Sequence, residues 1–155
     1  MLDLFQYNWQ VREDWFRWCE KISIEELRKE RTGGMGSIIK NLYHVCDCEQ
    51  LWVAHLQERP SIESSIYSIS TLQEVIDFSN KTRAVTEDFL RFWTLEDEDK
   101  ILEIQSKTGK VHTFTYGKVL RHIITHEIHH IGQLSVWARE LNVKPVSSDL
   151  IMRDY

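Results

Sequence analysis

One stretch decides how this chain folds: residues 116–141, with the sequence YGKVLRHIITHEIHHIGQLSVWAREL. It contains no proline, and its only glycines are Gly117 and Gly132, so we expect one long helix. At 3.6 residues per turn its apolar residues share one face, which predicts that the helix packs against neighbours along its length. The residues on that face are Val119, Ile123, Leu134, Trp137 and Leu141.

The same stretch contains four of the seven histidines of the chain. His126 and His130 lie one turn apart and about 40° apart around the helix axis, on the apolar face. His122 and His129 lie on the flank of that face. Imidazoles at positions i and i+4 can bind one metal ion together, because adjacent turns bring their nitrogens within reach of a single ion. A pair of buried histidines without a metal is the alternative interpretation, although burying two such groups without a shared partner is costly.

Length and composition are typical of one soluble globular domain. The chain has 155 residues, of which 42% are hydrophobic and 28% are charged. Its net charge of −5 and its lack of a basic patch with interleaved aromatic residues argue against a nucleic-acid partner. No apolar run reaches membrane-spanning length and the N-terminus lacks a basic signal-peptide start, so we expect a cytoplasmic protein without a membrane partner. Cys19, Cys46 and Cys48 do not form a disulfide framework.

Clusters of glycine, proline and serine divide the chain into helical segments. We expect four long helices at about residues 2–19, 37–58, 71–93 and 116–141, with a short helical turn at about 23–30. Ser23, Ser37 and Thr71 are candidate N-caps, and Glu26 and Glu74 would complete capping boxes. Residues 101–105 and 111–115 flank Ser-Lys-Thr-Gly-Lys, which predicts a short hairpin or an extended loop. The predicted fold is therefore all-α: one domain over residues 1–155, an antiparallel four-helix bundle with a longer crossover or short hairpin before the last helix.

Two histidines hold an ion weakly, so we expect a third ligand from another helix. His44 is the best candidate, because it lies at the edge of the apolar face of the second long helix. His55 lies about 16 Å further along that helix and cannot reach the same ion. His112 lies in the region before the last helix, and the sequence does not place it.

A site of three histidines leaves at least one coordination position for water or substrate, as in catalytic zinc centres. Three neutral nitrogens suit zinc, nickel, copper or ferrous iron, so the donor set alone does not choose the metal. A bound ion would lower the pKa of water or of a thiol. Asp47 and Glu127 are candidate acceptors for the outer N–H groups of the histidines.

The segment 126–130 also matches the HExxH pattern of metallopeptidases, in which Glu127 would be the general base. The extended pattern fails, because Gln133 and Val136 stand where it needs a glycine and a third histidine. The other common scheme needs a glutamate on a later helix, and the only downstream glutamate, Glu140, lies on the same helix. We therefore do not favour a peptidase.

Several blocks of sequence carry a resemblance to a known family: FQYNW at 5–9 with Arg12, GGMGSI at 33–38, NLYHVCD at 41–47, HIITHEIHHIGQL at 122–134 and VSSDLI at 146–151. They resemble the DinB family of damage-inducible, metal-dependent proteins. The resemblance covers nearly the whole chain and implies a four-helix bundle with a three-histidine site, in a homodimer. Carried over by position, the metal ligands are His44, His126 and His130, and His129 is a flanking residue.

The wider superfamily includes transferases and isomerases that use low-molecular-weight thiols such as bacillithiol or mycothiol, which shapes our leading hypothesis. We expect a divalent ion, zinc or nickel, that holds a small thiol as its thiolate for attack on a small electrophilic substrate. The residues expected to line the mouth and contact the thiol are Tyr7, Asn8 and Arg12, with Trp9. The alternatives are a metal-dependent hydrolase, in which Glu127 or His129 passes protons, and a non-catalytic, stress-related metal-binding module.

Overall fold

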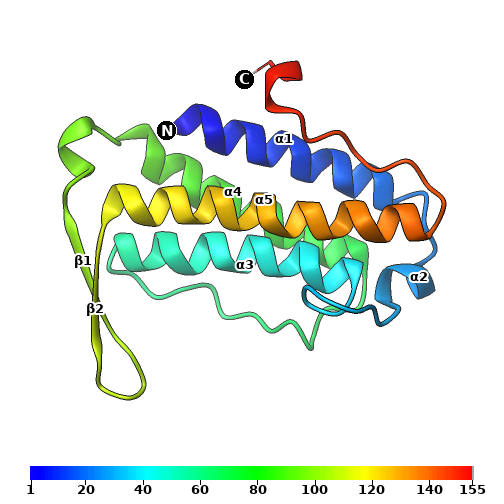
Figure 1. Ribbon diagram of the computed structural model, residues 1–155. Coiled ribbons are helices and arrows are strands. Elements are labelled where there is room, and N and C mark those ends of the chain that lie inside the picture. The colour runs from blue at the N-terminus through cyan, green and yellow to red at the C-terminus, as the bar shows by residue number, and fades with distance from the viewer. Residues whose placement is uncertain (155) are drawn as a thin grey trace.

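The computed structural model describes residues 1–154 of the chain. Four long helices lie side by side and a two-stranded hairpin projects from one end (Figure 1). The elements are α1 (Leu2–Cys19), α2 (Ile24–Arg28), α3 (Ile38–Leu56), α4 (Leu72–Arg91), η1 (Leu95–Asp97), β1 (Ile101–Gln105), β2 (Val111–Thr115), α5 (Tyr116–Glu140) and η2 (Leu150–Met152). The prediction of an all-α four-helix bundle with a short hairpin before the last helix is confirmed.

Helix α5 lies beside α3 and runs in the opposite direction (Figure 1). Helix α3 also packs on α4, and α1 packs on both α4 and α5. The C-terminal end of α3 and the N-terminal end of α5 are therefore both close to the hairpin. This antiparallel pair matters for function, because it carries every histidine of the long helices.

The helices begin where the sequence predicts. The Ser37 hydroxyl accepts a hydrogen bond from the Lys40 N–H, and Thr71 and Glu74 form a reciprocal capping box. Ser23 caps α2 by accepting from the Glu26 N–H. Each bond satisfies a backbone donor that the first helical turn leaves without a partner. The predicted caps therefore fix the start of three helices.

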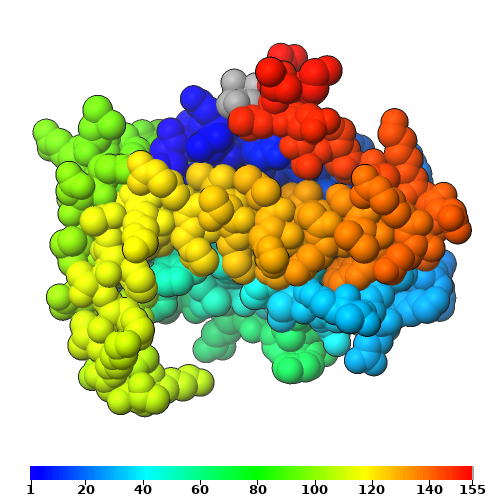
Figure 2. Space-filling view, in the orientation of Figure 1, coloured from blue at the N-terminus to red at the C-terminus, as the bar shows by residue number. Residues whose placement is uncertain are grey.

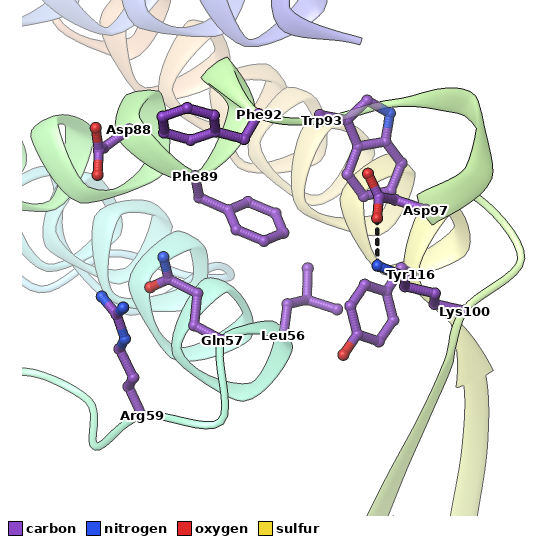
Figure 3. A pocket seen from close by; sticks show the side chains of 10 residues that line it. All are labelled: Leu56, Gln57, Arg59, Asp88, Phe89, Phe92, Trp93, Asp97, Lys100 and Tyr116. Carbon is purple, nitrogen blue, oxygen red and sulfur yellow. Dashed lines mark hydrogen bonds and ion pairs between the residues drawn. The ribbon is translucent and has the colours of Figure 1, made fainter.

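The two strands of the hairpin pair antiparallel, with Ile101 opposite Thr115 and Gln105 opposite Val111. Leu102 and Phe114 turn toward the bundle and pack on its hydrophobic core. Next to the hairpin, the end of the bundle is hollowed by an open cavity of about 430 Å³ (Figure 3). Its walls come from the ends of α3 and α4, from η1 and from the start of α5.

The segment after α5 folds back along α1, as the space-filling view shows (Figure 2). The Tyr7 hydroxyl donates to the Ser148 carbonyl at 2.6 Å, and the Trp18 indole donates to the Lys144 carbonyl at 3.0 Å. Side chains of α1 thereby anchor the C-terminal segment. None of the helices within residues 1–154 combines the length and the apolar character needed to span a bilayer.

Candidate metal centre

Three histidines from two helices meet between α3 and α5, and we call them the histidine cluster: His44, His126 and His130. One candidate ligand atom from each lies within 4.8 Å of the others. The ring centroids are 5.0 Å apart for His44 and His126, 4.8 Å for His44 and His130, and 4.5 Å for His126 and His130. The three residues that the sequence singled out are therefore brought together.

The Nε2 atoms of His126 and His130 are 3.2 Å apart. Two nitrogens that each bond a tetrahedral ion at about 2.0–2.1 Å stand about 3.4 Å apart, so this spacing suits a shared ion. Without an ion, the two rings can share only one proton between these atoms. The buried Nδ1 atom of His126 has no hydrogen-bond partner within residues 1–154. The pair is thus incompletely satisfied by protein groups alone.

The orientation of His130 is fixed by two amide side chains. Its Nδ1 atom lies 3.1 Å from the Asn41 Oδ1 atom and 2.8 Å from the Gln133 Oε1 atom. Both partners are acceptors, so Nδ1 carries the proton and the Nε2 lone pair of the neutral ring is free for an ion. The Asn41 amide also donates to the His130 carbonyl at 3.0 Å, which ties α3 to α5 at this point.

The glycine-rich turn before α3 closes over these amides. Gly34 has a positive φ of +50°, and the Met35 N–H donates to the Asn41 Oδ1 atom at 3.1 Å. A Cβ atom at Gly34 would lie 2.7 Å from the Asn41 Oδ1 atom and 2.7 Å from the Gln133 Oε1 atom. Only glycine lets the turn approach the groups that orient His130.

Burial keeps the cluster neutral. Desolvation, together with the neighbouring His130 and His44, lowers the pKa of His126 to about 4. Burial also lowers the pKa of His44, against the opposing charge of Asp47, and the pKa of His130, against its hydrogen bond to Gln133. At neutral pH the three imidazoles are therefore uncharged, and each has a nitrogen lone pair. This is the protonation state that a metal ion requires of a histidine ligand. The donor set fits a divalent ion.

The other histidines have different positions. His129 is exposed: its Nε2 atom lies 3.1 Å from the Gln133 amide, and its ring packs edge to face on His130 at a centroid distance of 5.2 Å. His122 is exposed beside His126, at a centroid distance of 5.5 Å. His112 stacks on Phe114 in the hairpin. None of these three belongs to the histidine cluster.

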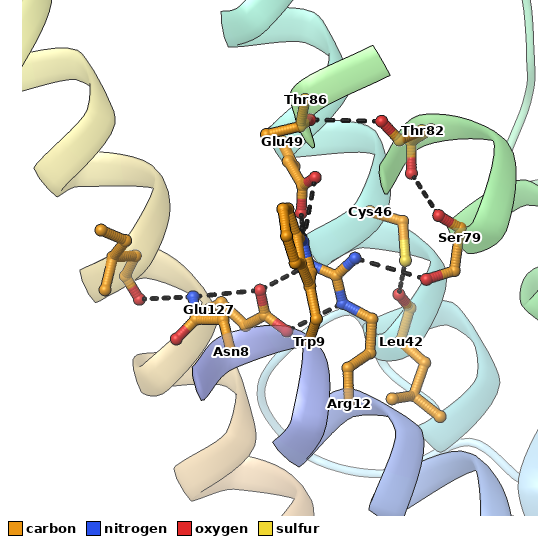
Figure 4. Close-up of polar contacts among 11 residues, drawn as sticks. Asn8, Trp9, Arg12, Leu42, Cys46, Glu49, Ser79, Thr82, Thr86 and Glu127 are labelled. Carbon is orange, nitrogen blue, oxygen red and sulfur yellow. Dashed lines mark hydrogen bonds and ion pairs between the residues drawn. The ribbon is translucent and has the colours of Figure 1, made fainter. Parts of the chain in front are cut away.

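Glu127 points into a second polar cluster, which we call the charged network: Arg12, Glu49 and Glu127 (Figure 4). The Arg12 Nε and Nη2 atoms donate to the two carboxylate oxygens of Glu127 at 2.9 and 2.6 Å, and Nη2 also donates to Glu49 at 2.6 Å. All three residues are at most 1% exposed. Burial raises the pKa of Glu127, and the Arg12 charge opposes this shift.

Neighbouring side chains complete the network. Asn8 donates to the Glu127 Oε2 atom at 3.2 Å, and the Trp9 indole lies 3.3 Å from both oxygens of Glu49. Arg12 also donates to the Ser79 hydroxyl at 3.3 Å, so the network draws on α1, α3, α4 and α5.

The residues expected at the mouth of the site lie in the interior. Asn8 and Arg12 are each 1% exposed within the charged network, and Tyr7 is 4% exposed and contacts the C-terminal segment. The carboxylates expected to orient the histidines also have other partners, since Glu127 binds Arg12 and Asp47 accepts from Gln50 at 2.9 Å.

Sequence reasoning gave no role to Asn41 and Gln133, which do orient His130. The available signal was spacing. Asn41 lies three residues before His44, and Gln133 lies three residues after His130, so each shares a helix face with a ligand.

Comparison with known proteins agrees with the fold. The model of the DinB family matches residues 1–154. An uncharacterized protein of Bacillus subtilis, YizA, is 42% identical over 153 residues, which are 99% of this chain and 95% of that protein. A DinB-like protein from Bacillus cereus superposes with a TM-score of 0.74 at 18% identity, covering 94% of this chain and 93% of that one. A DinB family member from Shewanella denitrificans superposes with a TM-score of 0.65 at 15% identity, covering 99% and 86%.

Proposed function

Because the chain belongs to the DinB family, we propose that it is a metal-dependent enzyme that joins a small thiol to a small electrophile. The observation that carries the proposal is the donor set: within residues 1–154 the cluster comprises three histidines and no fourth protein ligand. Closed structural zinc sites have four protein ligands, whereas catalytic sites have three and leave a position for a reactant. Zinc or nickel is the ion we expect at these neutral nitrogens.

When bound, a divalent ion supplies a Lewis acid that lowers the pKa of a thiol in the remaining position. The protein residues do the rest. His44, His126 and His130 would hold the ion, while Asn41 and Gln133 keep the Nδ1 proton of His130 turned away from it. The thiol sulfur would form a bond to the electrophilic carbon, the leaving group would depart with its electron pair, and the thiol proton would pass to solvent.

The cysteine on the same face of α3 as His44 does not replace the external thiol. Cys48 lies one turn after His44, but it is 9% exposed and burial raises its pKa to about 12. A thiol held in this state is a poor nucleophile near neutral pH. This supports a thiol that enters from solution as the nucleophile.

The test has two measurements. Elemental analysis of protein purified without added metal should find about one divalent ion per chain, and the His44→Ala variant should lose it. The metal-loaded protein should couple a panel of small thiols to a chromogenic aryl halide, and His130→Ala should reduce turnover at least a hundredfold. The matched control is His55→Ala, which removes an exposed histidine of the same helix as His44 and should change neither result.

Two outcomes would reject this function. Turnover of esters or phosphoesters that needs no thiol would identify a hydrolase in which water is the nucleophile. An ion that stabilises the fold while no reaction depends on His130 would identify a structural metal in a binding module.

A further inference from the structure

A small apolar pocket lies beside the histidine cluster, at the junction of α3, α5 and the hairpin. It has a volume of about 200 Å³ and is lined by Trp52, Phe114, Lys118, Val119 and His122. The Trp52 ring packs edge to face on Phe114 and on His122, at centroid distances of 5.9 and 5.5 Å. Aromatic rings from three different elements therefore form a preformed apolar wall.

Two rows of side chains lead from the histidine cluster to this pocket. On α3 the row is His44, Cys48 and Trp52, and on α5 it is His130, His126, His122 and Lys118. Residues four apart share a helix face, and the two helices are antiparallel, so both rows advance toward the hairpin (Figure 1).

Contacts connect successive members of the two rows. On α5 the His122 and His126 rings are 5.5 Å apart, and the Trp52 ring of α3 lies 5.5 Å from the His122 ring. One turn of α5 separates His126 from His122, so the pocket begins about 6 Å from the metal ligands. The pocket and the metal centre therefore occupy one interhelical seam.

We propose that this pocket binds the apolar tail of the electrophilic substrate while its reacting atom lies at the histidine cluster. The inference rests on the proposed function and specifies its substrate class: molecules that carry a single aryl or branched alkyl group about 6–10 Å from the reacting atom. An apolar cavity of about 150 Å³ accommodates benzene, so this pocket has room for one ring. Lys118 is exposed at the rim and favours an acidic substituent at the outer end of that tail.

The larger cavity at the end of the bundle fits this role less well. Its walls include four charged side chains, those of Arg59, Asp88, Asp97 and Lys100 (Figure 3). Phe89 lies in its wall and is half-buried, as Phe114 is in the proposed pocket. A Phe89→Ala variant is therefore a matched control for Phe114→Ala.

Binding of paired probes to the zinc-loaded protein tests the pocket. Propane-1-thiol and 3-phenylpropane-1-thiol share a metal-binding group and differ by the ring. Calorimetry should show the phenyl compound binding about 10- to 100-fold more tightly, the gain expected from burying a ring. Phe114→Ala and Trp52→Ala should each remove at least tenfold of that preference, whereas Phe89→Ala should preserve it.

Phe114→Ala guards against a folding artefact, because Phe114 lies in the hairpin and outside the helices. Each variant is used only if its thermal transition is retained. Equal affinity of the two thiols, or a preference for the ring that Phe114→Ala leaves intact, would overturn the proposal that this pocket binds the apolar tail.

The same two tails on hydroxamates, which bind metals without thiol chemistry, separate the two proposals. A ring preference among hydroxamates without any thiol binding would reject the thiol reaction and support the pocket. Thiol binding without a ring preference in either series would reject the pocket and leave the proposed function standing.

Discussion

Two polar clusters share α3 and α5 but are built in opposite ways. In the charged network the Arg12 guanidinium bonds to both carboxylates, and Asn8, Trp9 and Ser79 make further contacts with these groups. The histidine cluster is neutral and incomplete, with two ring nitrogens 3.2 Å apart and a buried Nδ1 atom of His126 that has no partner within residues 1–154.

The contrast begins at adjacent positions. His126 and Glu127 are neighbours in sequence, but successive helical residues point about 100° apart, so one side chain enters each cluster. A buried network whose charges pair with one another acts on stability and on the packing of the helices. A cluster whose free lone pairs converge is a candidate metal site. The arrangement teaches that converging lone pairs, more than polarity, identify such a site.

The largest expected effect would break the charged network. Arg12→Met removes the cation that pairs with two buried carboxylates, and uncompensated buried charge of this kind costs about 3–5 kcal/mol. The free energy of unfolding, measured by urea denaturation, should fall by that amount.

Arg17→Ala is the control for this variant, because it breaks an exposed ion pair with Asp14. Its cost should be about 0–1 kcal/mol. If the two variants were equally stable, the charged network would not support the fold and the contrast drawn above would fail.

A smaller and more selective effect is expected at Gly34. A methyl group there meets both amides that orient His130. Gly34→Ala should therefore weaken zinc binding about tenfold or more, by analogy with other losses of groups that orient metal ligands, and should destabilise the protein. Zinc affinity by competition with a chromogenic chelator is the measurement.

Gly36→Ala separates strain from contact. Gly36 also has a positive φ, +81°, but a Cβ atom there meets nothing within 4 Å. This variant should cost stability through backbone strain alone and leave zinc affinity unchanged. Equal loss of zinc affinity in both variants would show that the turn acts through its backbone and not through Asn41 and Gln133.

Local features of the fold could be predicted from sequence, because they depend on neighbouring residues. The cap residues Ser37 and Thr71 start the helices predicted from them, and the hairpin occupies the two apolar stretches that flank Gly109. The grouping of His44 with His126 and His130 also followed from helix faces together with the family resemblance.

The roles of the remaining polar residues depend on how two helices are rotated and staggered against each other, which periodicity does not specify. Spacing placed Asn41 on the same face as His44 but could not show that it reaches across to His130. Glu127 was a candidate for proton transfer because it follows His126, yet the packing of α1 on α5 gives it Arg12 as a partner. Such pairings are properties of the assembled bundle.

The smallest expected effect is on the way the free energy of unfolding of the metal-free protein depends on pH, to which both clusters contribute. An unfolded histidine has a pKa of about 6.5, whereas burial holds the pKa of His126 at about 4 in the folded state. Between these values the unfolded chain binds a proton that the folded chain does not, so the free energy of unfolding must fall as pH drops from 6.5 toward 4. The raised pKa of Glu127 has the opposite effect on the free energy of unfolding, because the folded state takes up that proton first as the pH falls.

Urea unfolding of chelator-treated protein at pH 7, 6 and 5 should therefore show a smaller loss of stability with falling pH in His126→Gln than in the unsubstituted chain. If the free energy of unfolding fell equally with pH in both proteins, the pKa of His126 would be the same in the folded and unfolded states. A ring as well solvated as that would not need a metal ion to satisfy its nitrogens.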